Sequence, residues 1–93
     1  MRNIILNGKR MISCEVTHAY LKRKLKLPPY YGRNLDALYD VLTEINEDVV
    51  IKLINQHIMV ERLGLYGEKI IQVFRDAEEE NHRLLFSSDD GIK

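Results

Sequence analysis

The run VVIKLI, residues 49–54, decides the fold class of this 93-residue chain. Its residues are β-branched or apolar except for Lys52, a composition typical of a strand buried on both faces of a sheet. Upstream, the run RNIIL at residues 2–6 predicts a second short strand, because it is largely apolar and stops at the turn pair Asn7-Gly8. Residues 84–87 predict a third, weaker strand.

Helical patterns fill the chain between these strands. Ser13 is the predicted N-cap of a first helix, which we expect Pro28 and Pro29 to end, and Asn34 is the predicted N-cap of a second. A short third helix is expected at residues 56–63, and a fourth after Gly64 and Gly67. The apolar stripes of the first, second and fourth helices are Cys14, Thr17, Leu21 and Leu25; Leu35, Leu38, Leu42 and Ile45; and Ile70, Val73, Phe74 and Ala77.

This alternation of strands and helices predicts an α/β fold, with a small parallel sheet covered by helices. With 45% hydrophobic and 30% charged residues, the chain has the composition of one ordinary domain, expected to span residues 1–93 with a flexible tail at 88–93. Cys14 is the single cysteine, and the chain shows no leader and no run of 18 apolar residues. We therefore expect a cytoplasmic protein that does not insert into a membrane.

The charges are strongly segregated although the formal net charge is zero. Residues 1–27 hold seven basic residues against Glu15, whereas residues 34–50 hold five acidic residues and no basic one. Residues 76–80 add four more acidic residues. The two acidic segments are candidates to meet in space and to form one acidic surface.

The stretch YYGRNLDALYD, residues 30–40, contains two aspartates, and the stability of the fold does not explain why both are present. At about 100° per residue, Asp36, Asp40, Thr43 and Glu47 share one flank of the second helix, away from its apolar stripe. Asp36 lies in the first turn, where the helix dipole favours a carboxylate. Asp40 lies beyond that turn and repels Asp36 at i,i+4 by about 0.2–0.5 kcal/mol.

Tyrosines surround these acids. Tyr30 and Tyr31 precede the helix, Tyr39 lies within it, and Gly32 is expected to let the tyrosine loop turn sharply into the helix. Amphipathic rings beside charges are typical of a binding surface. The residues themselves therefore predict an acidic face that recognises a basic partner.

Three blocks of the sequence resemble the barstar family, small intracellular inhibitors of the bacterial ribonuclease barnase. They are LKLPPYYGRNLDALYDVL at residues 25–42, ILNG at 5–8 and IIQVFRDA at 70–77. The resemblance implies a three-stranded parallel sheet, no catalytic activity and no cofactor. It also implies a one-to-one complex with a basic, barnase-like extracellular or toxin-type ribonuclease, in which carboxylates imitate the phosphates of RNA.

Carried over by position, the resemblance implies a partner-binding set in the second helix, the loop before it and the fourth helix. Where the family has tryptophan, glycine, tryptophan and glutamate, this chain has Tyr39, Glu44, Ile45 and Asp76. These departures bear on which ribonuclease is bound. The implied partner-binding residues are Tyr30, Tyr31, Gly32, Asn34, Asp36, Tyr39, Asp40, Thr43, Glu44 and Asp76.

Other functions are less favoured by the residues. Asp36 and Asp40 on an exposed helix face lack the enclosing apolar pocket of an acid–base pair, which argues against an enzyme. His18, His57 and His82 lack metal-binding spacing, so we expect no metal site and interpret His18 as a hydrogen-bonded, half-buried histidine. An RNA-binding module that uses the basic segment at residues 22–26 remains the alternative function.

Overall fold

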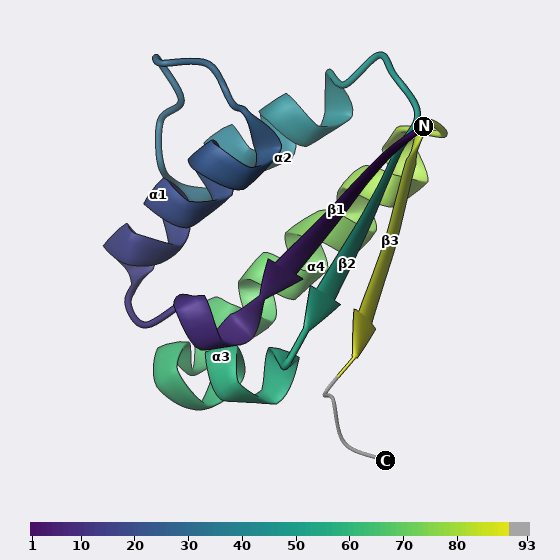
Figure 1. Ribbon diagram of the computed structural model, residues 1–93. Coiled ribbons are helices and arrows are strands. Elements are labelled where there is room, and N and C mark those ends of the chain that lie inside the picture. The colour runs from purple at the N-terminus through teal and green to yellow at the C-terminus, as the bar shows by residue number, and fades with distance from the viewer. Residues whose placement is uncertain (90–93) are drawn as a thin grey trace.

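The structure is a computed structural model that describes residues 1–89. Within this range the elements are β1 (Arg2–Asn7), the 3₁₀ helix η1 (Gly8–Arg10), α1 (Cys14–Leu25), α2 (Leu35–Thr43), β2 (Val49–Ile54), α3 (Gln56–Leu63), α4 (Leu65–Glu80) and β3 (Leu84–Asp89). The strands form one sheet in the order β1-β2-β3, and both neighbouring pairs are parallel (Figure 1). The predicted α/β fold with a small three-stranded parallel sheet is confirmed.

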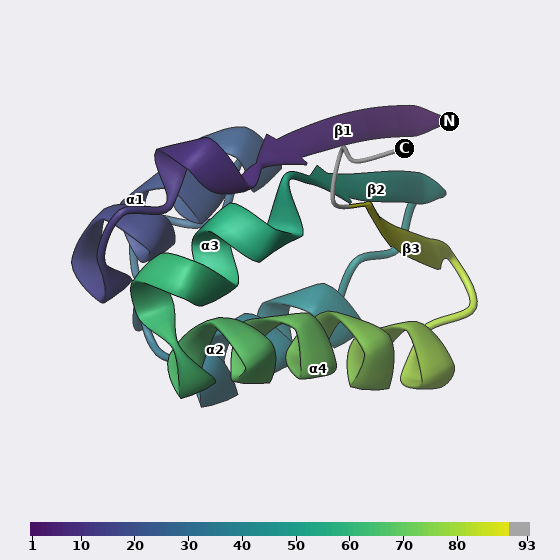
Figure 2. The same cartoon turned by 90° about the horizontal axis from the view of Figure 1, so that it is seen from below.

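The helices pack against one face of this sheet, with α2 and α4 below it in Figure 2. The register aligns Ile4 with Ile51 and Ile51 with Phe86, and these side chains point toward the helices. The alternate residues Ile5 and Lys52 are exposed. The prediction that residues 49–54 are buried on both faces is therefore wrong. An apolar run predicts a strand, but the number of faces that helices cover is a property of the tertiary packing.

Both predicted N-caps are confirmed. The Ser13 hydroxyl accepts a hydrogen bond from the Val16 N–H at 3.2 Å, and Asn34 Oδ1 accepts one from the Ala37 N–H at 2.8 Å. Each cap satisfies a backbone donor that the first helical turn leaves free. By starting α2 at residue 35, Asn34 also determines which side chains of that helix face the core.

Helix ends differ from the expected positions. α1 ends at Leu25, before the two prolines, because Lys26 adopts a left-handed conformation with φ 54° and the Leu27 N–H donates to the Lys22 carbonyl at 2.9 Å. α4 begins at Leu65, so that Gly67 lies inside its first turn. No helix within residues 1–89 is long and apolar enough to cross a membrane.

The α3 range agrees with the sequence pattern, whereas β3 is two residues longer than predicted. Ser88 and Asp89, which the sequence placed in a flexible tail, belong to β3 and pair in register with β2. The remainder of that predicted tail, residues 90–93, lies outside the described residues.

The buried face of α1 is not the predicted stripe throughout. Cys14 is exposed, and His18 is fully buried together with Thr17 and Leu21. His18 lies between two tyrosines: its Nδ1 is 2.6 Å from the Tyr31 hydroxyl and its Nε2 is 2.6 Å from the Tyr66 hydroxyl. The hydrogen bonding predicted for His18 is confirmed, but its side chain is fully buried and not half-buried.

This arrangement predicts that the protein loses stability in acid. Burial, followed by the positive charge of Arg33, lowers the pKa of His18 below its ordinary value of 6.5. The unfolded chain therefore takes up a proton at a higher pH than the folded chain, and the free energy of unfolding should fall as the pH drops through 6.5 and level off below the folded pKa. Urea denaturation between pH 5 and 8 measures this loss.

The control is a comparison of two substitutions. His18→Gln should flatten the pH dependence over this range, whereas His82→Gln, at an exposed position in the turn after α4, should leave it unchanged. An equally steep dependence in His18→Gln would assign the acid sensitivity to other groups.

Candidate functional site

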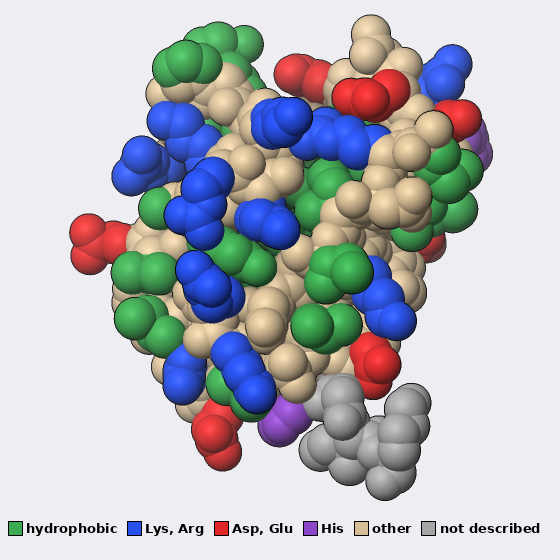
Figure 3. Space-filling view, viewed as in Figure 1, with side chains coloured by type: hydrophobic (Ala, Val, Ile, Leu, Met, Phe, Trp, Pro, Cys, Tyr) green, Lys and Arg blue, Asp and Glu red, His purple; other side chains and the backbone are tan. Residues whose placement is uncertain are grey.

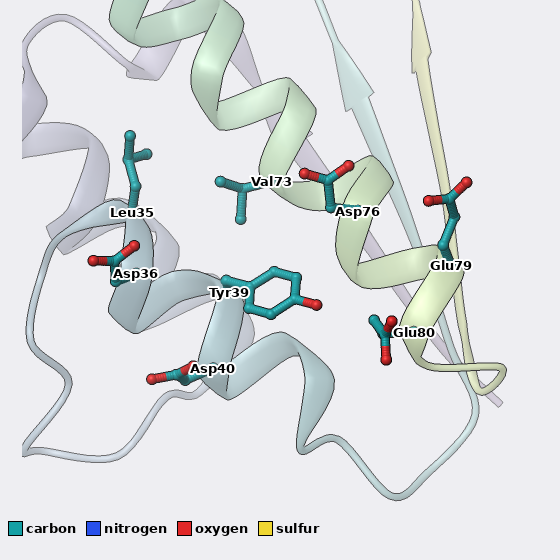
Figure 4. Close-up of a pocket in the computed structure, with 8 residues that line it drawn as sticks. All are labelled: Leu35, Asp36, Tyr39, Asp40, Val73, Asp76, Glu79 and Glu80. Carbon is teal, nitrogen blue, oxygen red and sulfur yellow. The ribbon is translucent and has the colours of Figure 1, made fainter.

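An acidic groove lies between α2 and α4 (Figure 4). It is open, has a volume of about 520 Å³, and contains five carboxylates from two helices that are far apart in sequence. Within the described residues its lining includes no basic side chain. The groove is lined by Leu35, Asp36, Tyr39, Asp40, Val73, Asp76, Glu79 and Glu80.

The α2 side of the groove follows from the Asn34 cap. Leu38 and Leu42 are fully buried against the core, and helical geometry then leaves Asp36 and Asp40 exposed one turn apart. The predicted placement of these two aspartates on one exposed flank is confirmed. Glu47, which the same spacing placed on that flank, is not there, because α2 ends at Thr43 and Glu47 pairs with Arg2 at 3.4 Å.

The α4 side supplies Asp76, Glu79 and Glu80, so the two acidic segments do meet as the sequence suggested. Asp76 accepts a hydrogen bond from Gln72 Nε2 at 2.9 Å, which orients its carboxylate. Glu78 has a different role: it accepts a hydrogen bond from the Phe86 N–H at 2.9 Å and fixes β3 to α4. Three of the four acids at residues 76–80 therefore face the groove.

Tyr39 lies between the two acidic sides, and Figure 4 shows its ring reaching across toward α4. Partial burial raises the pKa of Tyr39, and the negative charges of Glu80, Asp76 and Asp40 raise it further. Carboxylates from both helices thus act on the same phenol. The electrostatic potential in the groove is therefore negative, which favours positive charge there.

The two tyrosines in the loop before α2 differ strongly in exposure. Tyr30 is 86% exposed, whereas Tyr31 is 6% exposed and its hydroxyl contacts His18. The Tyr30 ring is therefore displayed to solvent, and Tyr31 anchors the loop in the core. The sharp turn attributed to Gly32 involves a positive φ of 55° at Arg33 instead, while a Cβ at Gly32 would lie 3.1 Å from the Ala37 Cβ.

A second, smaller hollow of about 210 Å³ adjoins the groove on the other side of α2. Asp40 borders both depressions, while Glu44 and Tyr30 border the smaller one. Glu44 is the exposed C-cap of α2, and the Thr43 hydroxyl donates to the Asp40 carbonyl at 2.9 Å. Asp40 is therefore the predicted site residue that connects the groove with this hollow.

The basic side chains are spread over a different face. Figure 3 shows Lys and Arg side chains across the face formed by α1 and β1. Arg10 and Arg23 lie 6.0 and 5.6 Å from the centre of the Tyr20 ring. Tyr20 is buried and its hydroxyl accepts a hydrogen bond from the Asn7 N–H at 2.9 Å. Its ring is already occupied on this face, which argues against base stacking.

Sequence reasoning left four lining residues out of the predicted site: Leu35, Val73, Glu79 and Glu80. Val73, Asp76 and Glu80 follow one another at spacings of three and four, so they lie on one face of α4, and that spacing was available in the sequence. The charge pattern made the acidic segment of the second helix a candidate neighbour of this face, and the structure shows that the two lie together. Among residues 1–89, no three His, Cys, Asp or Glu side chains come close enough to hold a metal ion.

Two comparisons with known proteins agree with this geometry. The family described as Barstar (barnase inhibitor) matches residues 1–89. A Bacillus subtilis (strain 168) protein named "Putative ribonuclease inhibitor YrdF" is 42% identical over 81 residues, which cover 86% of this chain and 89% of that protein. With its three-stranded parallel sheet and the acidic face on α2, the chain belongs to the barstar family.

Proposed function

We propose that the protein inhibits a basic ribonuclease by inserting the acidic groove and the exposed tyrosine loop into its active site. The observation that carries this proposal is the convergence of five carboxylates from α2 and α4 in a chain of the barstar family. The Bacillus subtilis relative, whose name describes it as a ribonuclease inhibitor, also supports the proposal. The complex has one inhibitor for each ribonuclease.

The mechanism is imitation of RNA charge. A ribonuclease active site holds phosphates with cationic side chains, and carboxylates accept the same charge-assisted hydrogen bonds. Asp36 and Asp40 repel one another in the free inhibitor, and cations of the ribonuclease that bridge them remove this repulsion. The carboxylates therefore bind more favourably to a cluster of cations than to a single one.

The proposed contact residues divide by position. Tyr30, Tyr39 and Glu44 form an aromatic and acidic margin around the aspartates, and Thr43 lies beside them at the end of α2. Tyr31, Gly32 and Asn34 shape the loop and the start of the helix. To the contacts implied by the resemblance we add Glu79 and Glu80, so that the carboxylates expected to meet the ribonuclease are Asp36, Asp40, Asp76, Glu79 and Glu80.

The proposal assigns the carboxylates a binding role and no acid–base role, since the groove is open to solvent and proton-transfer chemistry favours an enclosed site. It also places the protein in the cytoplasm, where an inhibitor protects cellular RNA from a ribonuclease made in the same cell. The departures at Tyr39, Glu44, Ile45 and Asp76 suit a ribonuclease whose rim differs from that of barnase.

Titration of ribonuclease activity tests the proposal. Increasing amounts of the protein are added to barnase and to basic ribonucleases secreted by the host, and activity on a fluorogenic RNA substrate is followed. We expect activity to fall to zero at one equivalent for the cognate enzyme. Full activity at excess inhibitor, together with no binding by calorimetry for every enzyme, would reject the function.

The alternative function makes an opposite prediction about RNA. Because the chain has zero net charge and Tyr20 is buried beneath two arginines, binding of short single-stranded RNA at physiological salt should be negligible. Fluorescence anisotropy measures this directly. Salt-sensitive micromolar binding that disappears when the four basic residues at 22–26 are neutralised would favour the RNA-binding module instead.

A further inference from the structure

Asn81, the residue that follows α4, makes an unusual set of contacts for a position with no predicted role. Its side chain is buried, at 8% exposure. Its Nδ2 donates to the carbonyls of Leu42 and Ile45, both at 2.9 Å, and its Oδ1 accepts from the Arg83 N–H at 3.0 Å. Both amide hydrogens and the amide oxygen are therefore engaged.

These contacts join the ends of the two helices that form the acidic groove. Leu42 lies in the last turn of α2, where carbonyls lack an intrahelical partner, and Ile45 lies just beyond it. Asn81 follows Glu80 directly, and Leu42 is two residues after Asp40. We call these contacts the Asn81 bridge. It lies at one end of the groove and connects its two sides.

The Asn81 bridge opposes the charge repulsion across the groove. Like charges on α2 and α4 repel across the groove, and this repulsion favours separation of the two helices. Buried apolar residues such as Leu38 and Phe74 hold the bodies of the helices together, but apolar contacts are not directional. Two hydrogen bonds from one planar amide to two fixed carbonyls are directional, and they determine where α2 ends relative to α4.

We propose that Asn81 is a positioning residue for ribonuclease binding, which sets the distance between the carboxylates of α2 and those of α4. It is too buried to contact a partner. The identity of the residue matters, because aspartate would face the two carbonyl oxygens with no donor and leucine would leave both carbonyls without their partner. This inference rests on the proposed function for its effect on inhibition.

The first test needs no ribonuclease. In Asn81→Leu, opening of the groove should move Glu80 and Asp76 away from Tyr39, so that the pKa of Tyr39, raised in the parent, falls toward its ordinary value of 10.0. NMR titration with ¹³C-labelled tyrosine reads this residue individually. A Tyr39 pKa unchanged from that of the parent would reject the positioning role of Asn81. This outcome does not depend on whether the protein inhibits a ribonuclease.

The second test measures binding to the ribonuclease that the parent inhibits. Asn81→Leu should weaken affinity roughly tenfold, whereas Asn46→Leu, a matched change at an exposed position of the connection after α2, should alter it by less than about twofold. Circular dichroism establishes that each variant is folded. Parent affinity in a folded Asn81→Leu protein would overturn the positioning role.

A double-mutant cycle separates positioning from a general loss of stability. Combined with Asp76→Asn, Asn81→Leu should weaken affinity by less than the product of the two single losses, because the contribution of Asp76 depends on the groove geometry. Combined with Tyr30→Ala on the loop, it should weaken affinity by the full product of the two single losses. Multiplicative effects in both cycles would contradict the proposal. If Asn81→Leu fails to fold, Asn81→Ala, which removes the donors without added bulk, takes its place in all three measurements with the same expected directions.

Discussion

Replacing Asp40 with alanine should weaken ribonuclease inhibition more than any other single truncation on the acidic surface. Asp40 borders both the groove and the smaller hollow, so it lies closest to the centre of the proposed interface. Truncation removes an attractive pair and leaves a cation of the ribonuclease desolvated without a partner, which costs about 2–5 kcal/mol. That range comes in part from the barnase–barstar pair itself, so it is carried over from the family.

Inhibition constants and stopped-flow rates measure this effect. Asp36→Ala should rank second, and Asp76→Ala should cost less, because its carboxylate is partly engaged with Gln72. Glu15→Ala, an exposed acid on α1 outside the groove, is the matched control and should leave inhibition unchanged. If Asp40→Ala inhibited like the parent, or if Glu15→Ala were the damaging change, the acidic groove would not be the inhibitory surface.

The free protein supplies an independent check on Asp40. Its side chain is exposed and lies within one turn of Asp36, so its removal should leave the free energy of unfolding unchanged or slightly raised. A loss beyond about 1 kcal/mol in urea denaturation would assign Asp40 a structural role. Salt gives a second check: the association rate should fall as ionic strength rises, while the dissociation rate changes little.

Gly8→Ala should be among the most destabilising single-atom additions in the protein. Gly8 is buried where β1 passes into η1, and a Cβ at this position would lie 2.2 Å from the carbonyl oxygen of Asn55. The obstacle is backbone that follows the central strand, so it cannot move without disturbing β2. We expect the free energy of unfolding to fall by more than about 2 kcal/mol.

Gly64→Ala is the control for this prediction. Gly64 has φ 60° and ψ −133°, a conformation that L residues rarely adopt, but a Cβ there would meet no non-neighbouring atom within 4 Å, so its substitution costs conformational strain alone, about 1–3 kcal/mol. Urea denaturation of both variants compares steric overlap with strain. A Gly8→Ala protein as stable as the parent would mean that β1 and the residue after β2 separate easily.

The amino-acid sequence by itself determined the features that depend on neighbouring residues. The caps at Ser13 and Asn34, the strand at residues 49–54 and the common flank of Asp36 and Asp40 all follow from backbone geometry within one or two turns of chain. Such features are encoded locally, because helical and extended backbones repeat with fixed periods. The alternation of strands and helices predicted the small parallel sheet, and the resemblance to the barstar family agreed with it and added the expected partner.

Tertiary structure decided everything that depends on which segments meet. Only packing determined that, within residues 1–89, helices cover one face of the sheet, since an apolar run such as residues 49–54 is compatible with one or two covered faces. The sequence predicted that the first strand stops at the pair Asn7-Gly8, and the structure has Asn7 as the last residue of β1 and Gly8 as the first of η1. The need for glycine at position 8 comes from Asn55, a residue 47 positions away. Likewise, Val73 joined the groove because α4 lies against α2, and Asn81 connects those helices through backbone carbonyls. A backbone carbonyl is the same in every residue, so the sequence cannot indicate which one a distant side chain will reach.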